Sequence, residues 1–187
     1  MIKILKDKQG TFTSFNLYFE DESRFGLFTR NGRSLTVKGV KPVCIFQQVF
    51  KSTWLFGAFS PKDGDKFILE LPHCSSDMFQ LYLDEFSKQK PNELKVLIVD
   101  NGAFHKAKKL RIPENIVLIF QPPYSPELNA AEKIWAAYKR DFTNKIHKTL
   151  DEVSSFIVDF TAKLSNDIVK STCSFEYVKE CFNWTIL

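Results

Sequence analysis

Three acidic residues stand where a folded chain could bring their carboxylates together. Asp21 lies in an acidic triplet that follows the apolar run 15–19. Asp100 directly follows the aliphatic run 94–99, and Glu132 comes later in the chain. Clustered carboxylates repel one another, so such a cluster is favourable only with cations bound, and oxygen-only ligation favours Mg²⁺ or Mn²⁺. Two such ions about 4 Å apart would support in-line phosphoryl displacement, so the acids predict phosphodiester chemistry.

Each of these acids also has a purely structural interpretation. Asp21 can belong to a solvated acidic turn. Asp100 opens the sequence Asp-Asn-Gly, which is typical of a hairpin turn, although the residues after it do not supply the second alternating strand of a hairpin. Glu132 can be a surface partner of Lys139 or Arg140. Residue types and spacing alone therefore leave both interpretations open.

The first part of the chain is expected to form a meander of strands. Short apolar and aromatic runs alternate there with turn residues. The predicted strands are 15–19, 25–28, 34–37, 43–50, 54–59 and 66–71. After Pro72 the apolar residues between 78 and 86 recur at helical spacing, with Ser75 or Ser76 as the N-cap. A helix is therefore expected to follow the meander.

The second part of the chain alternates strands and helices. Runs 94–99 and 116–120 are almost wholly aliphatic, as in parallel strands covered on both faces. A helix is expected over 126–142 with Ser125 as its N-cap, and Glu132 falls roughly 80° from the centre of its apolar stripe. A further helix begins with a capping box at 149–152, and the pattern weakens beyond residue 165. The fold class is an α/β mixed-sheet domain flanked by helices.

Composition restricts the class of protein. The 187 residues, 44% of them hydrophobic, suit one globular domain over 1–187 with a full-sized core. No apolar run approaches the roughly 18 residues that cross a bilayer, and the start of the chain lacks a signal peptide, so a cytosolic protein is expected. The four cysteines lack metal-binding spacing and are expected to be reduced core thiols: Cys44, Cys74, Cys173 and Cys181.

The basic charge is concentrated in one stretch of the chain. Residues 100–148 hold nine Lys or Arg against five acidic residues, which alone accounts for the formal net charge of +4. Such a stretch suits a face that approaches nucleic-acid phosphates, and it also suits a solvated lysine-rich surface. The candidate DNA-binding residues are Lys106, Lys108, Lys109, Lys139 and Arg140.

The sequence around the three acids resembles a known family. The segments concerned are 21–26 (DESRFG), 99–105 (VDNGAFH) and 121–135 (QPPYSPELNAAEKIW). They are similar, in the same order, to segments of bacterial insertion-sequence transposases of the mariner-like superfamily. The third segment is the most specific, since a long Pro-Pro-Tyr-Ser-Pro-Glu-Leu-Asn run is followed by Glu and then Trp.

The resemblance implies a ribonuclease H-like fold with a DDE metal site. It assigns the metal ligands and catalytic acids to Asp21, Asp100 and Glu132, without a covalent enzyme intermediate. The activity implied is cleavage of DNA at transposon ends by water, then strand transfer by the freed 3′ hydroxyl. Asn101, His105 and Asn129 match supporting positions of the motifs, and His105 can equally be a solvent-facing residue.

The chain departs from the family pattern in three respects. The interval between Asp100 and Glu132, at 31 residues, is a little shorter than the family's usual spacing, and a trimmed loop would absorb the difference. Members often carry proline where this chain has Ala130, which removes no ligand. Members also carry N-terminal helix-turn-helix modules, for which this sequence shows no counterpart, so end recognition is expected either from a separate helix-turn-helix protein of an upstream frame or to have been lost by truncation. Transposition implies DNA as a partner, a homodimer on it, and action in the bacterial cytosol. The alternatives are a ribonuclease H-like nuclease or an inactive nucleic-acid-binding remnant.

Overall fold

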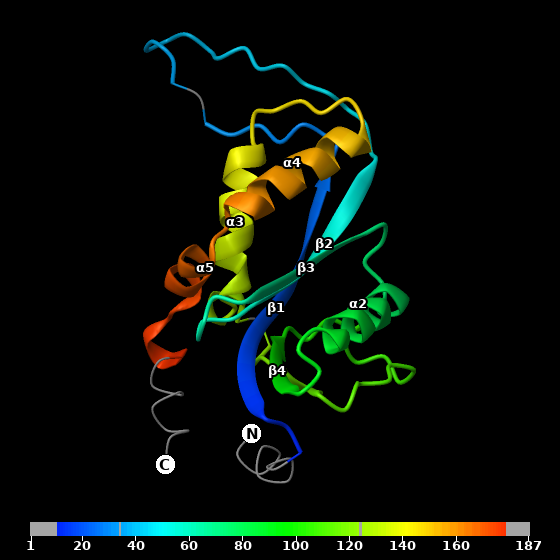
Figure 1. The fold of residues 1–187 in the computed structure, drawn as a ribbon. Coiled ribbons are helices and arrows are strands. Elements are labelled where there is room, and N and C mark those ends of the chain that lie inside the picture. The colour runs from blue at the N-terminus through cyan, green and yellow to red at the C-terminus, as the bar shows by residue number, and fades with distance from the viewer. Residues whose placement is uncertain (1–10, 34, 124, 179–187) are drawn as a thin grey trace.

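A five-stranded mixed sheet with helices on both faces forms the centre of the molecule (Figure 1). The computed structural model describes residues 11–33, 35–123 and 125–178. The strands are β1 (Ser14–Gly26), β2 (Ser52–Phe59), β3 (Lys66–Leu71), β4 (Glu93–Val99) and β5 (Ile116–Phe120). The helices are α2 (Ser76–Lys88), α3 (Ala131–Phe142), α4 (Leu150–Lys163) and α5 (Asn166–Cys173), with a 3₁₀ turn η1 (Pro126–Leu128) before α3.

The strand order is β3-β2-β1-β4-β5. Strands β1, β2 and β3 pair antiparallel, whereas β4 pairs parallel to both β1 and β5. This arrangement confirms the expected meander followed by parallel strands. Strand β1 therefore lies at the centre, with an antiparallel neighbour on one side and a parallel neighbour on the other.

Side chains of β1 alternate between two apolar cores. Leu17 and Phe19 pack with α3, α4 and α5 on one face of the sheet. Tyr18 packs with α2 on the other face, where its ring meets Phe86 edge-on at 5.0 Å. Because successive side chains of a strand point to opposite faces, this alternation also decides the face on which each acid of the triplet lies.

Capping side chains fix where three helices begin. The Ser75 hydroxyl accepts a hydrogen bond from the Met78 backbone N–H, as predicted. Thr149 caps α4 through the Glu152 N–H, and the Glu152 carboxylate accepts in return from Lys148 N–H rather than from the cap residue. Ser165 likewise caps α5, a helix that the weakening sequence pattern did not predict.

Strand β1 is longer than the sequence predicts. It does not end before the acidic triplet but continues through it to Gly26, so Asp21 lies within the strand and not after it. Pairing with β2 explains the extension, since Asp21 is opposite Gly57 and the ladder continues to Gly26 opposite Ser52. The neighbouring strand therefore overrides the weak strand preference of acidic residues.

The described residues of the segment 27–51, namely 27–33 and 35–51, form a long loop instead of the predicted strands over 34–37 and 43–50, and Ser34 lies outside the described residues. The described residues of this loop contain no strand, and the loop extends away from the sheet and helices (Figure 1). Its base is held by the Thr29 N–H, which donates to the Gln47 carbonyl at 3.0 Å. Strand preference alone did not produce a sheet here because an isolated pair of strands is only marginally stable.

The predicted helix over 126–142 is interrupted. A 3₁₀ turn occupies Pro126–Leu128, and α3 begins only at Ala131. Ser125 makes no side-chain cap bond, so its prediction as the N-cap is wrong. Asn129 supplies the bond instead, because its side-chain oxygen accepts from the Ala131 N–H at 3.0 Å.

The cysteines differ in their environment. Cys173 is buried and Cys74 is partly buried, but Cys44 lies exposed in the long loop, so the prediction of a core position is wrong for Cys44. All three carry free thiols. Cys181 lies outside the described residues. In the described part of the chain, no helix is both long and apolar enough to cross a membrane.

Candidate metal centre

Strands β1 and β4 place two of the predicted acids side by side. The two strands are parallel and in register, with Phe19 opposite Ile98. Continuing this register by two residues sets Asp21 opposite Asp100. By strand alternation both lie on the face that α3 covers, because Phe19 and Ile98 pack in that core.

Helix α3 brings the third acid to the same place. Glu132 is exposed in the first turn of α3. Asn129, just before the helix, is buried and donates from its side-chain nitrogen to the Glu20 carbonyl at 2.9 Å. The start of α3 is thereby attached to β1 next to Asp21.

The other two predicted acids act on the electrostatics of Asp21. Burial raises the pKa of Asp21 from 3.8 to about 8, and the negative charges of Glu22, Glu132 and Asp100 contribute to the rise. Within the described residues, no Lys or Arg forms an ion pair with Asp21 or Glu132. The donor set fits a divalent cation, because Mg²⁺ and Mn²⁺ prefer oxygen ligands such as carboxylates.

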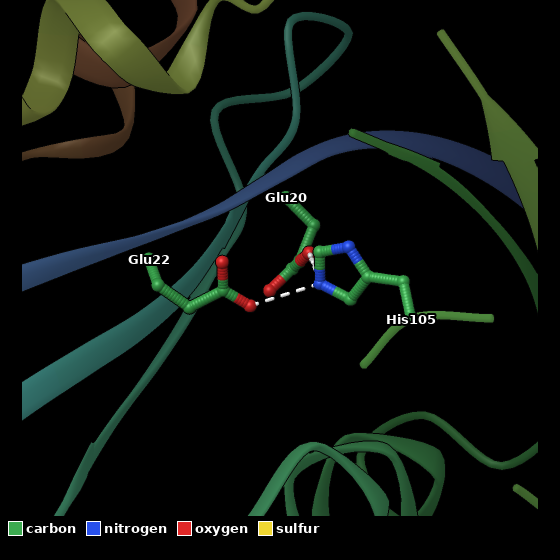
Figure 2. A group of neighbouring side chains, drawn as sticks. All are labelled: Glu20, Glu22 and His105. Carbon is green, nitrogen blue, oxygen red and sulfur yellow. Dashed lines mark hydrogen bonds and ion pairs between the residues drawn. The ribbon is translucent and has the colours of Figure 1, made fainter. Parts of the chain in front are cut away.

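A second, tighter cluster lies on the opposite face of the sheet (Figure 2). Glu20, Glu22 and His105 offer potential ligand atoms that all lie within 4.8 Å of one another. The three predicted acids do not form so close a group in the described structure. The His105 Nε2 atom is 3.0 Å from Glu22 Oε1 and 3.6 Å from Glu20 Oε2.

His105 also reaches one of the predicted acids. Its Nδ1 atom is 2.8 Å from Asp100 Oδ1. Burial acts to lower the pKa of His105, but the hydrogen bond and charge of Glu22 and the charge of Asp100 outweigh it and raise the pKa. With a proton on each nitrogen, the ring donates to a carboxylate on either side.

Glu20 is the most buried acid of this cluster. Its side chain is fully buried, and neither carboxylate oxygen has a hydrogen-bond partner. Burial, followed by the charges of Glu22 and Asp21, raises the pKa of Glu20 well above its ordinary value. Sequence reasoning missed Glu20 and Glu22, although their spacing of two residues in a strand signals a common face.

The predicted supporting residue Asn101 makes structural bonds. Asn101 donates from its side-chain nitrogen to the Gln121 carbonyl, which joins the ends of β4 and β5. Its side-chain oxygen accepts from Lys106, whose ammonium also lies 5.1 Å from the centre of the Phe120 ring. The hairpin alternative for Asp100-Asn101-Gly102 is wrong, because β5 is parallel to β4.

The predicted DNA-binding residues fall into two groups. Lys139 and Arg140 line a cavity of about 410 Å³ together with Arg30, Thr143 and Glu132. This cavity places basic side chains next to one predicted metal ligand.

The other group follows β4. Lys106 contacts Asn101, Lys108 is exposed, and Lys109 pairs with Asp77 of α2 at 2.6 Å. Lys109 therefore lies away from the cavity beside Glu132 and contacts α2 on the other face of the sheet.

The architecture defines the class of fold to which the chain belongs. A mixed sheet with two acids opposite each other on central parallel strands, and a third on the helix that covers them, is a ribonuclease H-like fold.

Comparison with known proteins gives the family. The family model described as DDE superfamily endonuclease matches residues 16–154, and the chain therefore belongs to this family. The chain is 38% identical over 103 residues to the uncharacterized protein y4pE/y4sA of Sinorhizobium fredii (strain NBRC 101917 / NGR234). That match covers 54% of this chain and 76% of the relative.

Solved transposase structures share the fold. The chain resembles the Mos1 strand transfer complex with a TM-score of 0.68 at 14% identity, over 92% of this chain and 53% of that one. It resembles the Mos1 mariner paired end complex with Mn with a TM-score of 0.67 at 14% identity, over 84% of this chain and 51% of that one. The chain thus spans about half the length of the Mos1 chains.

Proposed function

We propose that this chain is a transposase catalytic domain in which Asp21, Asp100 and Glu132 hold two Mg²⁺ or Mn²⁺ ions. The observation that carries the proposal is the environment of Asp21, whose half-buried carboxylate is surrounded by the negative charges of Glu22, Glu132 and Asp100. Membership of the DDE superfamily endonucleases supports the same three ligands. The Mos1 paired end complex solved with Mn supports a divalent ion.

Two ions rather than one account for the arrangement of the acids. Asp21 neighbours both of the other acids. It is aligned with Asp100 when the strand register is continued, and the negative charge of Glu132 helps to raise its pKa. Asp21 would help to hold both ions, so the three acids would not need to converge on a single point. When bound by Asp21, Asp100 and Glu132, such ions would supply activation of the attacking water or 3′ hydroxyl and stabilisation of the leaving oxygen.

The substrate proposed is DNA, cut at transposon ends and joined to a target by the freed 3′ hydroxyl. The cavity lined by Arg30, Lys139 and Arg140 supports this substrate, because it offers three cations to a phosphate backbone next to Glu132. Lys106 and Lys108, at the end of β4, are proposed to extend these contacts, and Lys109 is proposed to join them when its pairing with Asp77 opens.

A homodimer on DNA is proposed because two transposon ends must be held together. The exposed loop over 27–51 supports this proposal, since large apolar side chains such as Leu35 and Val43 are fully exposed there. Apolar surface that gathers into a patch marks interaction sites, and we propose that these side chains form such a patch. Recognition of the ends by a separate helix-turn-helix protein stays a prediction.

The test is metal-dependent cleavage and joining of DNA by the purified chain. A supercoiled plasmid reports nicking, and a labelled oligonucleotide with a free 3′ hydroxyl reports strand transfer into it. We expect Asp21→Asn, Asp100→Asn and Glu132→Gln each to reduce both reactions to background in Mg²⁺ or Mn²⁺. Asp141→Asn is the matched control, because Asp141 is an exposed acid of α3 that pairs with Lys145 at 3.3 Å.

The outcomes separate the three functions. Nicking without strand transfer would indicate a ribonuclease H-like nuclease, and neither reaction in the wild-type chain would indicate an inactive remnant. Cleavage that persists in all three variants would show that these acids are not the metal ligands.

A further inference from the structure

We propose that His105 and Glu22 are positioning residues that set the carboxylate of Asp100 for metal binding. The proposal rests on the proposed function, since it assumes that Asp100 is a metal ligand. It concerns a hydrogen-bonded chain from Asp100 through the His105 ring to Glu22 on the opposite face of the sheet.

Asp100 needs such support because it stands just beyond the end of β4. Its side chain is 53% exposed, which leaves it free to rotate unless other groups hold it. Its Oδ1 atom accepts from the Gly102 N–H at 2.7 Å and lies 2.8 Å from His105 Nδ1. One carboxylate oxygen is thereby hydrogen-bonded within the protein, and the other remains available to bind a cation.

The His105 ring is itself held in place. It is buried between the Phe79 and Phe104 rings, at centroid distances of 4.5 and 4.1 Å. Its second nitrogen is fixed by Glu22 at 3.0 Å, with Glu20 near it at 3.6 Å (Figure 2). A ring packed and bonded at both nitrogens cannot turn, so it fixes the Asp100 oxygen that it contacts.

The acidic triplet of β1 therefore serves both faces of the sheet. Asp21 points to the face of α3 as a ligand, whereas Glu20 and Glu22 point to the face of α2 and brace His105. Asp21 and Asp100 are thus connected in two ways. One is the alignment of β1 with β4, and the other is the set of bonds from Asp100 to His105 and from His105 to Glu22 in β1. Groups that orient metal ligands in this way commonly change metal affinity or activity by about 10- to 100-fold when they are removed.

The test measures Mn²⁺ binding to the full chain by electron paramagnetic resonance, together with the rate of nicking and the melting temperature. We expect Glu22→Leu and His105→Leu to weaken Mn²⁺ binding by about 10- to 100-fold. Glu22→Gln keeps an oxygen acceptor for Nε2, so it is expected to recover part of this loss. Glu93→Gln is the matched control, a buried acid of β4 bonded to the Tyr18 hydroxyl at 2.8 Å, and it should leave Mn²⁺ binding unchanged.

A double-mutant cycle separates positioning from general loss of structure. If His105 acts through Asp100, then His105→Gln weakens Mn²⁺ binding in the wild-type background but has no further effect in an Asp100→Asn background. Equal and additive losses in both backgrounds would overturn the proposal. This comparison uses His105→Gln, which keeps a polar side chain, so it holds even where His105→Leu fails to fold.

Two further results distinguish this proposal from its alternatives. If Asp21→Asn and Asp100→Asn abolish nicking while the Glu22 and His105 variants bind Mn²⁺ like the wild type, the positioning proposal fails and the proposed function stands. If Asp21→Asn still binds one Mn²⁺ tightly and Glu20→Gln removes it, the cluster of Glu20, Glu22 and His105 is itself a metal site, which also overturns positioning.

Discussion

Asp21 of β1 is aligned with Asp100, the residue that directly follows β4, when the parallel pairing of Phe19 with Ile98 is continued by two residues. Adjacent strands lie about 4.8 Å apart, and the negative charge of Asp100 adds to those of Glu22 and Glu132 in raising the pKa of the largely buried Asp21. A bound cation or a proton relieves the repulsion. The competition between these two determines how the candidate site responds to pH.

Metal affinity is expected to rise with pH up to about 8. Burial and the neighbouring carboxylates raise the pKa of Asp21 from 3.8 to about 8, so below that pH a cation must displace a proton. Each pH unit lost below 8 should weaken apparent Mn²⁺ binding by up to about tenfold. Titrations between pH 6 and 9 measure this slope, and a flat profile in the wild-type chain would contradict the raised pKa.

The same shift has a consequence for the metal-free protein. The carboxyl of Asp21 holds its proton more tightly when folded than when unfolded. Its contribution to stability is therefore full below its unfolded pKa of about 3.9 and is lost as the pH rises through about 8. Asp21→Asn cannot lose a proton, so it serves as the control for the stability profile.

Asn129 is expected to position Glu132 relative to Asp21. The buried Asn129 side chain donates to the Glu20 carbonyl at 2.9 Å and caps α3 through the Ala131 N–H. Asn129→Ala leaves that carbonyl buried without a partner, at a cost of about 1–3 kcal/mol of unfolding free energy. We expect a lower melting temperature together with weaker Mn²⁺ binding.

Ser125→Ala provides the comparison for Asn129. Ser125 precedes η1 but makes no cap bond, so its loss should change neither property. Equal effects of the two substitutions on melting temperature and Mn²⁺ binding would show that the start of α3 responds alike to the loss of either polar residue. In that event Asn129 would have no particular part in placing Glu132.

The strands and the acids at their ends follow from local sequence patterns. Runs 94–99 and 116–120 are aliphatic enough to indicate covered parallel strands, and the structure has both of them. A carboxylate directly after such a strand, as at Asp100, could therefore be assigned to the edge where sites assemble. The short segments around the three acids, above all the one that contains Glu132, also indicated the family to which the chain belongs.

Contacts between distant segments could not be predicted in this way. The extension of β1 through Asp21 depends on pairing with β2, and acidic residues on their own disfavour strands. The apolar residues of the loop over 27–51 have strand preference but no neighbouring strand to pair with. The bond between Glu22 and His105 joins residues 83 positions apart, so no local pattern contains it.

Basic residues beside Glu132 are expected to contribute to the salt dependence of DNA binding. Arg30 is held against the end of α3, since its carbonyl accepts from the Asn144 N–H at 2.9 Å, and it lines the same cavity as Lys139 and Arg140. Each phosphate contact that is removed should lower the slope of log affinity against log salt by about 0.9 on duplex DNA. We therefore expect Arg30→Ala and Arg140→Ala each to reduce the slope by about that amount.

Fluorescence anisotropy with a labelled duplex at several salt concentrations gives these slopes. Lys88→Ala is the control, because Lys88 ends α2 on the opposite face and pairs with Glu85 at 2.6 Å. If Lys88→Ala lowers the slope as much as Arg140→Ala does, DNA contacts both faces. The cavity beside Glu132 would then not be the path of the strand.

The exposed loop over 27–51 is expected to hold two copies together on DNA. The Val43 side chain is fully exposed and that of Ile45 is 78% exposed, so replacing both by serine removes no packing from the single chain. The melting temperature of the free protein should stay within a few degrees of the wild type, since surface substitutions usually change stability by no more than about 0.5 kcal/mol.

On paired transposon ends, however, the mass of the complex should fall from two copies to one. Sedimentation velocity measures that mass, and Val158→Ser, at a 64% exposed apolar position on α4, should leave it at two copies. A complex that keeps two copies after the double substitution would place the dimer contact elsewhere on the molecule.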